Sequence, residues 1–220
     1  MIRFEHVRKR YPGGHEALKN VSFRLHSGEM AFLTGHSGAG KSTLLKLIAL
    51  IERPSHGSIW VNQRNLARLH PRDIPAHRRR LGIIFQNPTL LFDRSVYENT
   101  AVPLRIAGCA EAETARRVRA ALGQVGLLDK ERLNPIALSG GEQQRLGIAR
   151  AIVAKPEVIL ADEPTGNLDP ALSREIMQLF QRLNQVGVTT LIASHDLDLI
   201  REFPNRQLIL AQGELVGDQP

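Results

Sequence analysis

The chain has 220 residues, of which 42% are hydrophobic, 5% aromatic and 23% charged, a composition that excludes a disordered chain and fits one globular domain with room for a small subdomain. Because it has no uncharged apolar run of about 20 residues and no apolar signal core after Met1, we expect neither a membrane span nor a secretory signal, and the single cysteine, Cys109, favours a reducing cytoplasm. The net charge of +7 is concentrated in the first half: residues 1–110 hold 17 Lys and Arg against 7 Asp and Glu, whereas residues 111–220 hold 12 against 15.

Apolar runs alternate with amphipathic segments along the whole chain. The apolar runs predict strands at Ile2–Val7, Val21–Leu25, Met30–Thr34, Ser58–Val61, Leu81–Phe85, Val158–Ala161, Val188–Ala193 and Gln207–Ala211. Helical patterns predict helices at Lys41–Ile51, Glu111–Val125, Gly141–Ala154, Ala171–Gln185 and Leu197–Glu202. The alternation predicts an α/β fold with a mostly parallel sheet between two layers of helices. The alternating pattern of the N-terminal strands adds a small antiparallel sheet.

The segment between Phe85 and Leu138 lacks strand signals and carries helical patterns instead. Ser95 and Glu98 have the spacing of a capping box, which marks the start of a helix. We therefore expect a single domain over residues 1–220 with a helical insertion. Its α/β core, including an N-terminal β subdomain, is expected to span approximately residues 1–86 and 155–220, and a helical subdomain approximately residues 87–154.

Residues 35–42 read Gly-His-Ser-Gly-Ala-Gly-Lys-Ser and fit the pattern G-x-x-x-x-G-K-[ST] at every fixed position. A predicted strand precedes this loop and a predicted helix follows it, which is the context that phosphate-binding loops require. The glycines let backbone N–H groups turn inward around phosphates, and the helix adds its positive N-terminal end. Lys41 then reaches the β- and γ-phosphates and the Ser42 hydroxyl ligates Mg²⁺, so the sequence predicts a nucleoside triphosphate site. The residues assigned to it are Gly35, His36, Ser37, Gly38, Ala39, Gly40, Lys41, Ser42 and Thr43.

The predicted strand at 158–161 ends in two adjacent acids, Asp162 and Glu163. Ligands bind at the carboxyl ends of parallel strands in such sheets. Because adjacent residues at a strand end point in different directions, the two acids can take separate tasks. We expect Asp162 to hold Mg²⁺ through its water shell and Glu163 to polarise the water that attacks the γ-phosphate.

A second helix start, Leu138-Ser-Gly-Gly-Glu142, also has the features of an anion site. Ser139 and Glu142 form a capping box, which needs no function. Gly140 and Gly141, however, are poor helix formers that expose bare N–H groups at a helix N-terminus, where backbone binds phosphate. One explanation is that this site serves the nucleotide of another copy, in a head-to-tail dimer with two identical composite sites.

These motifs, in this order and spacing, resemble the ATP-binding-cassette (ABC) ATPases over essentially all 220 residues. The resemblance implies two ATP molecules held between the phosphate loop of one protomer and Ser139, Gly140 and Gly141 of its partner. It implies that Tyr11 stacks on adenine; the alternative is a partly exposed aromatic at a strand end. It further implies that Gln86 contacts Mg²⁺ and the attacking water and that Asp169 lies in a loop that crosses the dimer interface. His195 would contact the γ-phosphate. A lone histidine at a strand end is ordinarily structural, but its position after the predicted strand Val188–Ala193 favours the functional role.

The resemblance also narrows the type of cassette. A lone cassette without membrane spans resembles the ATPase subunit of a complex with a separate transmembrane partner, at the cytoplasmic face of a bacterial inner membrane. The string 160–169 is typical of cassettes whose partners do mechanical work on the cell envelope, including macrolide- and lipoprotein-export ATPases, while residues 1–7 and 28–40 favour the cell-division type that acts at the septum. One departure is Leu50, where this pattern has glycine.

The basic first half leaves three interpretations open. An ATPase that binds nucleic acid is one, but no added nucleic-acid-binding module is present and no aromatics interleave with the basic runs. The cluster of Arg72, Arg78, Arg79 and Arg80 instead suggests a face toward the anionic inner leaflet. A solvated arginine-rich surface is the plain alternative.

Overall fold

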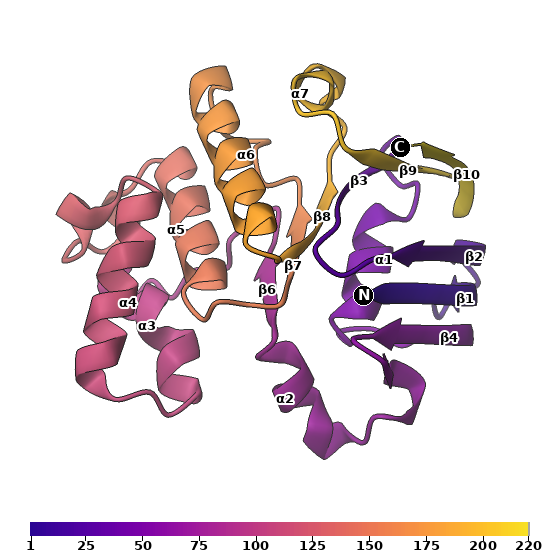
Figure 1. Cartoon of the computed structure of the whole chain (residues 1–220), viewed down its shortest axis with the longest axis horizontal. Coiled ribbons are helices and arrows are strands. Elements are labelled where there is room, and N and C mark those ends of the chain that lie inside the picture. Colours follow the sequence, from indigo (N-terminus) through magenta and orange to yellow (C-terminus); the bar gives the residue numbers. More distant parts are fainter. Residues whose placement is uncertain (220) are drawn as a thin grey trace.

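A computed structural model describes residues 1–219 and contains two sheets with helices around them (Figure 1). The larger sheet has six strands in the order β10-β9-β3-β8-β7-β6. All neighbouring strands in it are parallel except the edge hairpin of β9 and β10. Its strands are β3 (Met30–Thr34), β6 (Leu81–Ile84), β7 (Val158–Asp162), β8 (Thr189–Ala193), β9 (Arg206–Ala211) and β10 (Glu214–Gln219).

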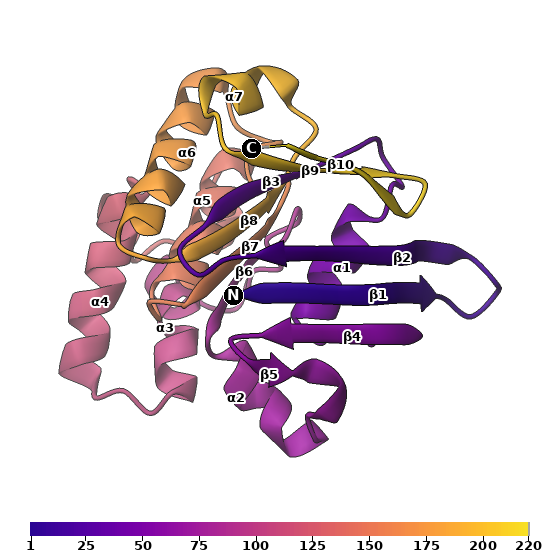
Figure 2. The ribbon, with the colours of Figure 1, turned by 45° about the vertical axis from the view of Figure 1, so that its right-hand side comes forward.

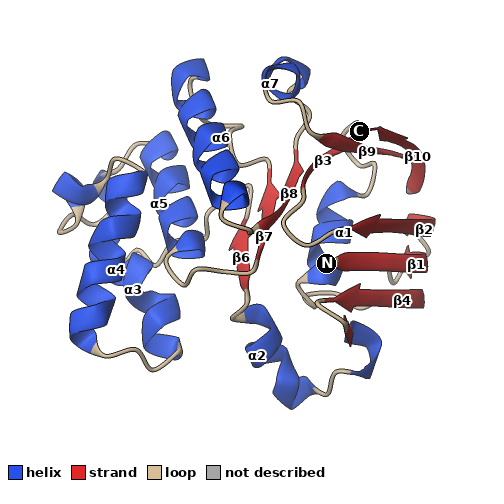
Figure 3. Ribbon diagram, in the orientation of Figure 1, coloured by secondary structure: helices blue, strands red, loops and turns tan. Residues whose placement is uncertain are grey.

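The parallel strands are apolar on both faces because both faces are covered. In β3, Met30 and Phe32 pack into one hydrophobic cluster while Ala31 and Leu33 pack into another. The first cluster joins the sheet to the helices α3, α4, α5 and α6, and the second joins it to α1 and the antiparallel sheet (Figures 1 and 3). These helices are α1 (Lys41–Ile48), α3 (Val96–Ile106), α4 (Glu111–Gln124), α5 (Gly140–Ile152) and α6 (Pro170–Gln185).

The smaller sheet is antiparallel, with the order β2-β1-β4-β5 (Figure 2). Its strands are β1 (Ile2–Arg10), β2 (Glu16–Leu25), β4 (His56–Val61) and β5 (Arg64–Asn65). A bulge interrupts β1, since the register of the β1–β2 pair shifts between Phe4 and Val7 and His6 has a φ of 49°. The bulge turns Val7 and Lys9 inward, onto the same side as Ile2 and Phe4.

The predicted fold class is confirmed, and most predicted elements are present. Those at 30–34 and 197–202 match β3 and α7 (Leu197–Glu202) at both ends. The helix predicted over 41–51 ends earlier, at Ile48, because Leu50 has a left-handed φ of 52°. The sequence patterns did not predict β5, β10 or α2 (Ile74–Arg78). Within residues 1–219, no helix combines the length and the apolarity that crossing a membrane requires.

Candidate active site

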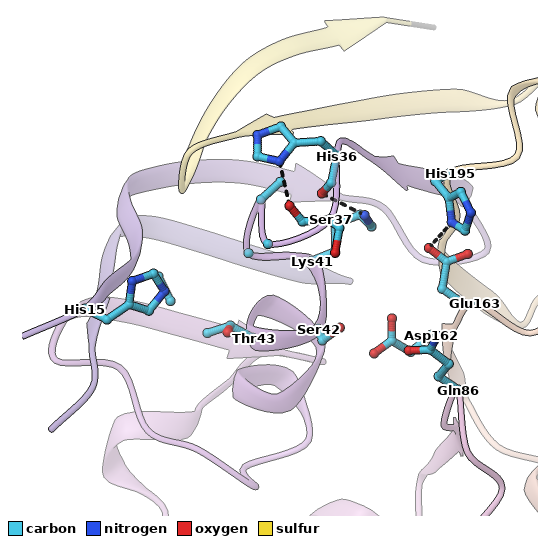
Figure 4. A pocket seen from close by; sticks show the side chains of 14 residues that line it. His15, His36, Ser37, Lys41, Ser42, Thr43, Gln86, Asp162, Glu163 and His195 are labelled. Carbon is cyan, nitrogen blue, oxygen red and sulfur yellow. Dashed lines mark hydrogen bonds and ion pairs between the residues drawn. The ribbon is translucent and has the colours of Figure 1, made fainter. Parts of the chain in front are cut away.

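A pocket of about 430 Å³ opens at the carboxyl ends of the parallel strands, between the loop after β3 and the residues that follow β6, β7 and β8 (Figure 4). It brings together twelve of the predicted site residues from four distant parts of the chain. Its lining consists of His15, Ala17, His36, Ser37, Gly38, Ala39, Gly40, Lys41, Ser42, Thr43, Gln86, Asp162, Glu163 and His195. His15 and Ala17 were not identified from the sequence, because they belong to the chain around the start of β2 and carry no motif.

The loop from Gly35 to Gly40 depends on glycine at both ends. Gly35 has a φ of 139°, and a Cβ there would lie 2.1 Å from the carbonyl oxygen of Leu210. Gly40 has a φ of 110°, and a Cβ there would lie 2.6 Å from the carbonyl oxygen of Ala17. Any side chain at either position would therefore displace β9 or β2 from the loop.

Lys41 is buried at the first turn of α1. Its Nζ donates hydrogen bonds to the carbonyl oxygens of Gly35 at 2.6 Å and His36 at 3.2 Å. These bonds hold the ammonium within the loop, so a cation and the positive end of α1 share the side of the pocket that the glycines form.

Asp162 and Glu163 face the phosphate loop across the pocket (Figure 4). Glu163 has a left-handed φ of 49°, and its backbone N–H donates to the carbonyl oxygen of Ala193 at 2.9 Å. Its carboxylate Oε1 lies 2.8 Å from Nδ1 of His195. The Glu163 side chain is only 11% exposed, whereas that of His195 is 71% exposed. The backbone thus fixes the Glu163 carboxylate, and this carboxylate contacts the His195 imidazole, which extends into the open part of the pocket.

Gln86 is exposed at the start of a segment that α5 holds in place. Gln144 of α5 donates from Nε2 to the carbonyl oxygen of Phe85 at 3.4 Å. Arg150 donates to the carbonyl oxygens of Pro88 and, at 3.1 Å, of Thr89. The chain around Gln86 is therefore fixed to the same helix that begins with the Ser-Gly-Gly motif.

Tyr11 is half-buried directly after β1 and is not part of the pocket lining. Its hydroxyl lies 3.3 Å from Oγ1 of Thr43. Its backbone N–H donates to the carbonyl oxygen of His15 at 2.9 Å, closing the turn that carries His15 to the pocket.

The second predicted anion site lies outside the pocket of its own chain. Ser139 is the N-cap of α5, and its hydroxyl accepts from the N–H of Glu142 while the Glu142 carboxylate accepts from the N–H of Ser139, so the predicted capping box is present. Ser139 and Gly140 are exposed. A Cβ on Gly141 would lie 3.2 Å from Cδ2 of Leu168, so glycine allows the loop 166–169 to approach the start of α5.

The charge of Glu142 is strongly stabilised. The hydrogen bond from Lys130, with the N–H and hydroxyl of Ser139, lowers the pKa of the Glu142 carboxyl from 4.5 to about 2. Arg145 lies 3.9 Å from the same carboxylate. The carboxylate that completes the capping box is therefore ionised throughout the neutral range.

A second cavity, of about 810 Å³, adjoins the first and shares Glu163 and His195 with it. Gly166 and Leu168 of the predicted interface loop also line this cavity. Asp169 ends the loop as the N-cap of α6, accepting from the N–H of Leu172 at 3.0 Å. The contact between Glu163 and His195 thus lies between the first pocket and the predicted interface loop.

The arginine cluster is partly engaged in internal contacts. Arg78 donates to the carbonyl oxygens of Ala49 at 3.1 Å and Leu50 at 2.7 Å, beyond the last turn of α1. Arg80 lies 3.6 Å from Glu157. Two of the four arginines therefore have structural contacts, and the exposed Arg72 and Arg79 are those for which the membrane-facing prediction stays open.

A phosphate loop on a buried strand, an acidic strand end opposite it and a glycine-rich helix start define an ATP-binding cassette. The chain belongs to the ABC transporter family: the family profile described as "ABC transporter" matches residues 18–166. As an ATPase of this family it hydrolyses ATP to ADP and phosphate.

The chain is similar to known proteins over almost its whole length. The chain is 60% identical over 217 residues to the cell division ATP-binding protein FtsE of Escherichia coli K12, covering 99% of this chain and 98% of that protein. It is 50% identical to the protein of the same name from Haemophilus influenzae, covering 98% and 99%. A solved dimeric structure of the ATP-binding cassette MJ0796 in a post-hydrolysis state, bound to ADP and Pi, superposes with a TM-score of 0.94 at 33% identity, covering 100% of this chain and 98% of that one.

Proposed function

We propose that this ATPase is a subunit of a bacterial cell-division complex with the transmembrane protein FtsX, in which cycles of ATP binding and hydrolysis regulate peptidoglycan hydrolysis at the septum. The observation that carries the proposal is the 60% identity to the E. coli protein FtsE over nearly the full length of both chains. In such a complex the transmembrane partner would hold this ATPase at the cytoplasmic face of the inner membrane.

The nucleotide would lie between two copies of the chain. Exposed N–H groups at a helix start favour phosphate binding. The start of α5 has this feature, but it does not line the pocket of its own chain: the lining lacks Ser139, Gly140 and Gly141. A head-to-tail dimer places these residues against the pocket of the partner and uses each interface twice. The dimeric state named for the MJ0796 structure supports this arrangement. Asp169, at the end of the loop that reaches the Glu163 side, would cross between the two sites.

The donor set suits Mg²⁺. Ser42, Gln86 and Asp162 line the same pocket, and within residues 1–219 no group of three or more His, Cys, Asp or Glu side chains forms a protein-only metal site. Mg²⁺ is ordinarily held by one or two carboxylates, a hydroxyl and substrate phosphates, with water completing the octahedron. When bound there, the ion would neutralise charge on the β- and γ-phosphates.

The chain's own groups would divide the remaining tasks. Lys41 and the loop N–H groups bind phosphate oxygens, and Glu163 orients the attacking water and accepts its proton. His195 holds that carboxylate through Nδ1 and leaves Nε2 free toward the γ-phosphate. Tyr11 stacks on adenine. Most of the rate enhancement comes from such positioning and charge neutralisation.

The helical subdomain of residues 87–154 would move with the nucleotide. It carries Ser139 at one end of α5, and the contacts of Gln144 and Arg150 attach the segment after Gln86 to the same helix. A contact of Gln86 with Mg²⁺ and the attacking water would therefore be transmitted to the dimer interface and to the membrane partner.

The test is complementation in E. coli depleted of its own FtsE. The chain, expressed with the E. coli membrane partner or its own, is expected to restore normal cell length, and the Glu163→Gln variant is expected to leave the cells filamentous at equal protein level. Filaments that persist with wild-type protein bound to its own partner would contradict the division role. An export defect without filaments, on deletion in the source organism, would instead favour the macrolide- or lipoprotein-export type. Retarded migration of long DNA at physiological salt would favour the nucleic-acid-binding alternative.

A further inference from the structure

We propose that Lys9 is a positioning residue for nucleotide binding, which fixes the ring of Tyr11 in the orientation that receives the base. This inference rests on the proposed stacking role of Tyr11. No motif marks Lys9, and strict alternation from Ile2 and Phe4 would place it on the outer face of the sheet. The bulge at His6 reverses that alternation and turns Lys9 inward.

The Lys9 ammonium is buried and fully engaged. The residue is only 8% exposed. Its Nζ donates to Oε2 of Glu52 at 2.7 Å and to the carbonyl oxygen of Arg53 at 3.0 Å. A buried charge costs free energy unless it is paired and hydrogen-bonded, and these two acceptors meet that need. An apolar side chain of similar length would fill the same space without that cost, so stability alone does not require an ammonium here.

The third neighbour of the ammonium is the Tyr11 ring. Nζ of Lys9 lies 4.8 Å from the ring centroid, within the range of a cation–π interaction. The hydroxyl at the far end of the ring lies 3.3 Å from Oγ1 of Thr43, in the first turn of α1. The ring is therefore held at one face and at its tip, which leaves the opposite face for a flat aromatic ligand such as a nucleobase.

Glu52 connects this arrangement to the phosphate-binding helix. It lies in the loop after α1, four residues beyond Ile48. The nearby Ser55 is joined to the end of β1: its N–H donates to the carbonyl oxygen of Arg8 at 2.8 Å, and its hydroxyl accepts from the N–H of Arg10 at 3.0 Å. The first turn of α1 contacts Tyr11 through Thr43, and the loop beyond the last turn holds Lys9. The base-binding side of the pocket thus has its position set by the helix that binds the phosphates.

Loss of the Lys9 ammonium should weaken the binding only of ligands that contain a base. Full-length variants are titrated by calorimetry with ATP and with inorganic tripolyphosphate, each with Mg²⁺. Lys9→Met is expected to weaken ATP binding about threefold to thirtyfold, the range of a partly buried cation–π contact, and to leave tripolyphosphate binding unchanged, because that ligand has no base. Lys9→Arg, which keeps a cation over the ring, is expected to restore most of the ATP affinity. Arg8→Met, on the exposed face of the same strand, is the matched control and should change neither.

The double variant separates positioning from general stabilisation. Lys9→Met combined with Tyr11→Ala is expected to bind ATP no more weakly than Tyr11→Ala alone, because Lys9 acts through the ring. Equal losses for ATP and tripolyphosphate, or additive losses in the double variant, would overturn the inference while leaving the role of Tyr11 intact. Unchanged ATP binding by Tyr11→Ala would instead refute the stacking role itself, and the inference with it. If Lys9→Met does not fold, Glu52→Gln gives the same test, since it removes the anion that holds the ammonium.

Discussion

Nδ1 of His195 lies 2.8 Å from Oε1 of Glu163, and the two side chains differ sharply in how firmly they are held. Glu163 is constrained by its left-handed backbone and by the hydrogen bond of its N–H to Ala193. His195 is exposed and has the carboxylate as its anchor. With Nδ1 engaged, only Nε2 remains to face the pocket, so the carboxylate also selects which nitrogen of the imidazole meets a ligand.

Replacement of Glu163 by glutamine is expected to separate binding from hydrolysis. Glu163→Gln keeps the shape and an acceptor for His195 but cannot take a proton, so turnover should fall about 100-fold or more, while ATP binding and ATP-dependent dimerisation persist. Phosphate release and size-exclusion chromatography with ATP measure the two effects. Glu175→Gln, an exposed glutamate on α6, is the control and should hydrolyse normally. Normal turnover by Glu163→Gln would remove Glu163 from its proposed role.

Leu50 is expected to tolerate glycine better than alanine. Its φ of 52° is costly for any residue with a Cβ, yet its side chain is 4% exposed and packs in the core. Leu50→Ala loses the packing and keeps the strain, whereas Leu50→Gly loses the packing but relieves the strain. The free energy of unfolding of Leu50→Gly should therefore exceed that of Leu50→Ala by about 1 kcal/mol. Urea unfolding of the two variants measures the difference, and a less stable glycine variant would contradict the argument.

The same residue shows how far sequence patterns reach. The phosphate loop, the strand before it and the acids at 162 and 163 were predictable, because each depends on a local pattern with a fixed spacing. The absence of glycine at Leu50 was visible, but its left-handed backbone was not. The helix prediction therefore continued three residues past Ile48.

Residues whose positions depend on contacts between distant segments could not be predicted. Lys9 faces inward only because of a bulge at His6, and no local signal marks that bulge. Arg150 reaches the chain after Gln86 across the packing of α5 on the end of β6. Their roles follow from tertiary structure, and the sequence contains only an ordinary lysine and an ordinary arginine.

The contribution of the capping box at Ser139 to the stability of the protein is expected to depend on pH. The folded-state pKa of Glu142, about 2, lies below its ordinary value of 4.5, so its contribution to stability is complete above about pH 4.5 and is lost as pH falls toward 2. Relative to Glu142→Gln, the wild type should be more stable by about 2 kcal/mol at neutral pH, and this advantage should shrink between pH 4.5 and 2. Urea unfolding of both proteins across that range measures it. The exposed control Glu175→Gln should show no such trend, and a difference between wild type and Glu142→Gln that is constant with pH would contradict the assignment.

Arg78 and Arg79 are adjacent, yet only Arg78 is expected to contribute to stability. The carbonyl oxygens of Ile48, Ala49 and Leu50, at and just beyond the end of α1, accept from His77 and Arg78 of α2.

Arg78→Ala leaves two of these carbonyls without their donor and should lower the free energy of unfolding by about 1–3 kcal/mol, whereas Arg79→Ala, which removes an exposed side chain, should leave it unchanged. Because α1 begins at the phosphate loop, loosening its far end should also weaken ATP binding in Arg78→Ala. Thermal unfolding with and without ATP checks both effects. Equal stability of the two variants would mean that water replaces Arg78 at the end of the helix, and that Arg78 is then as free as Arg72 and Arg79 to meet a membrane surface.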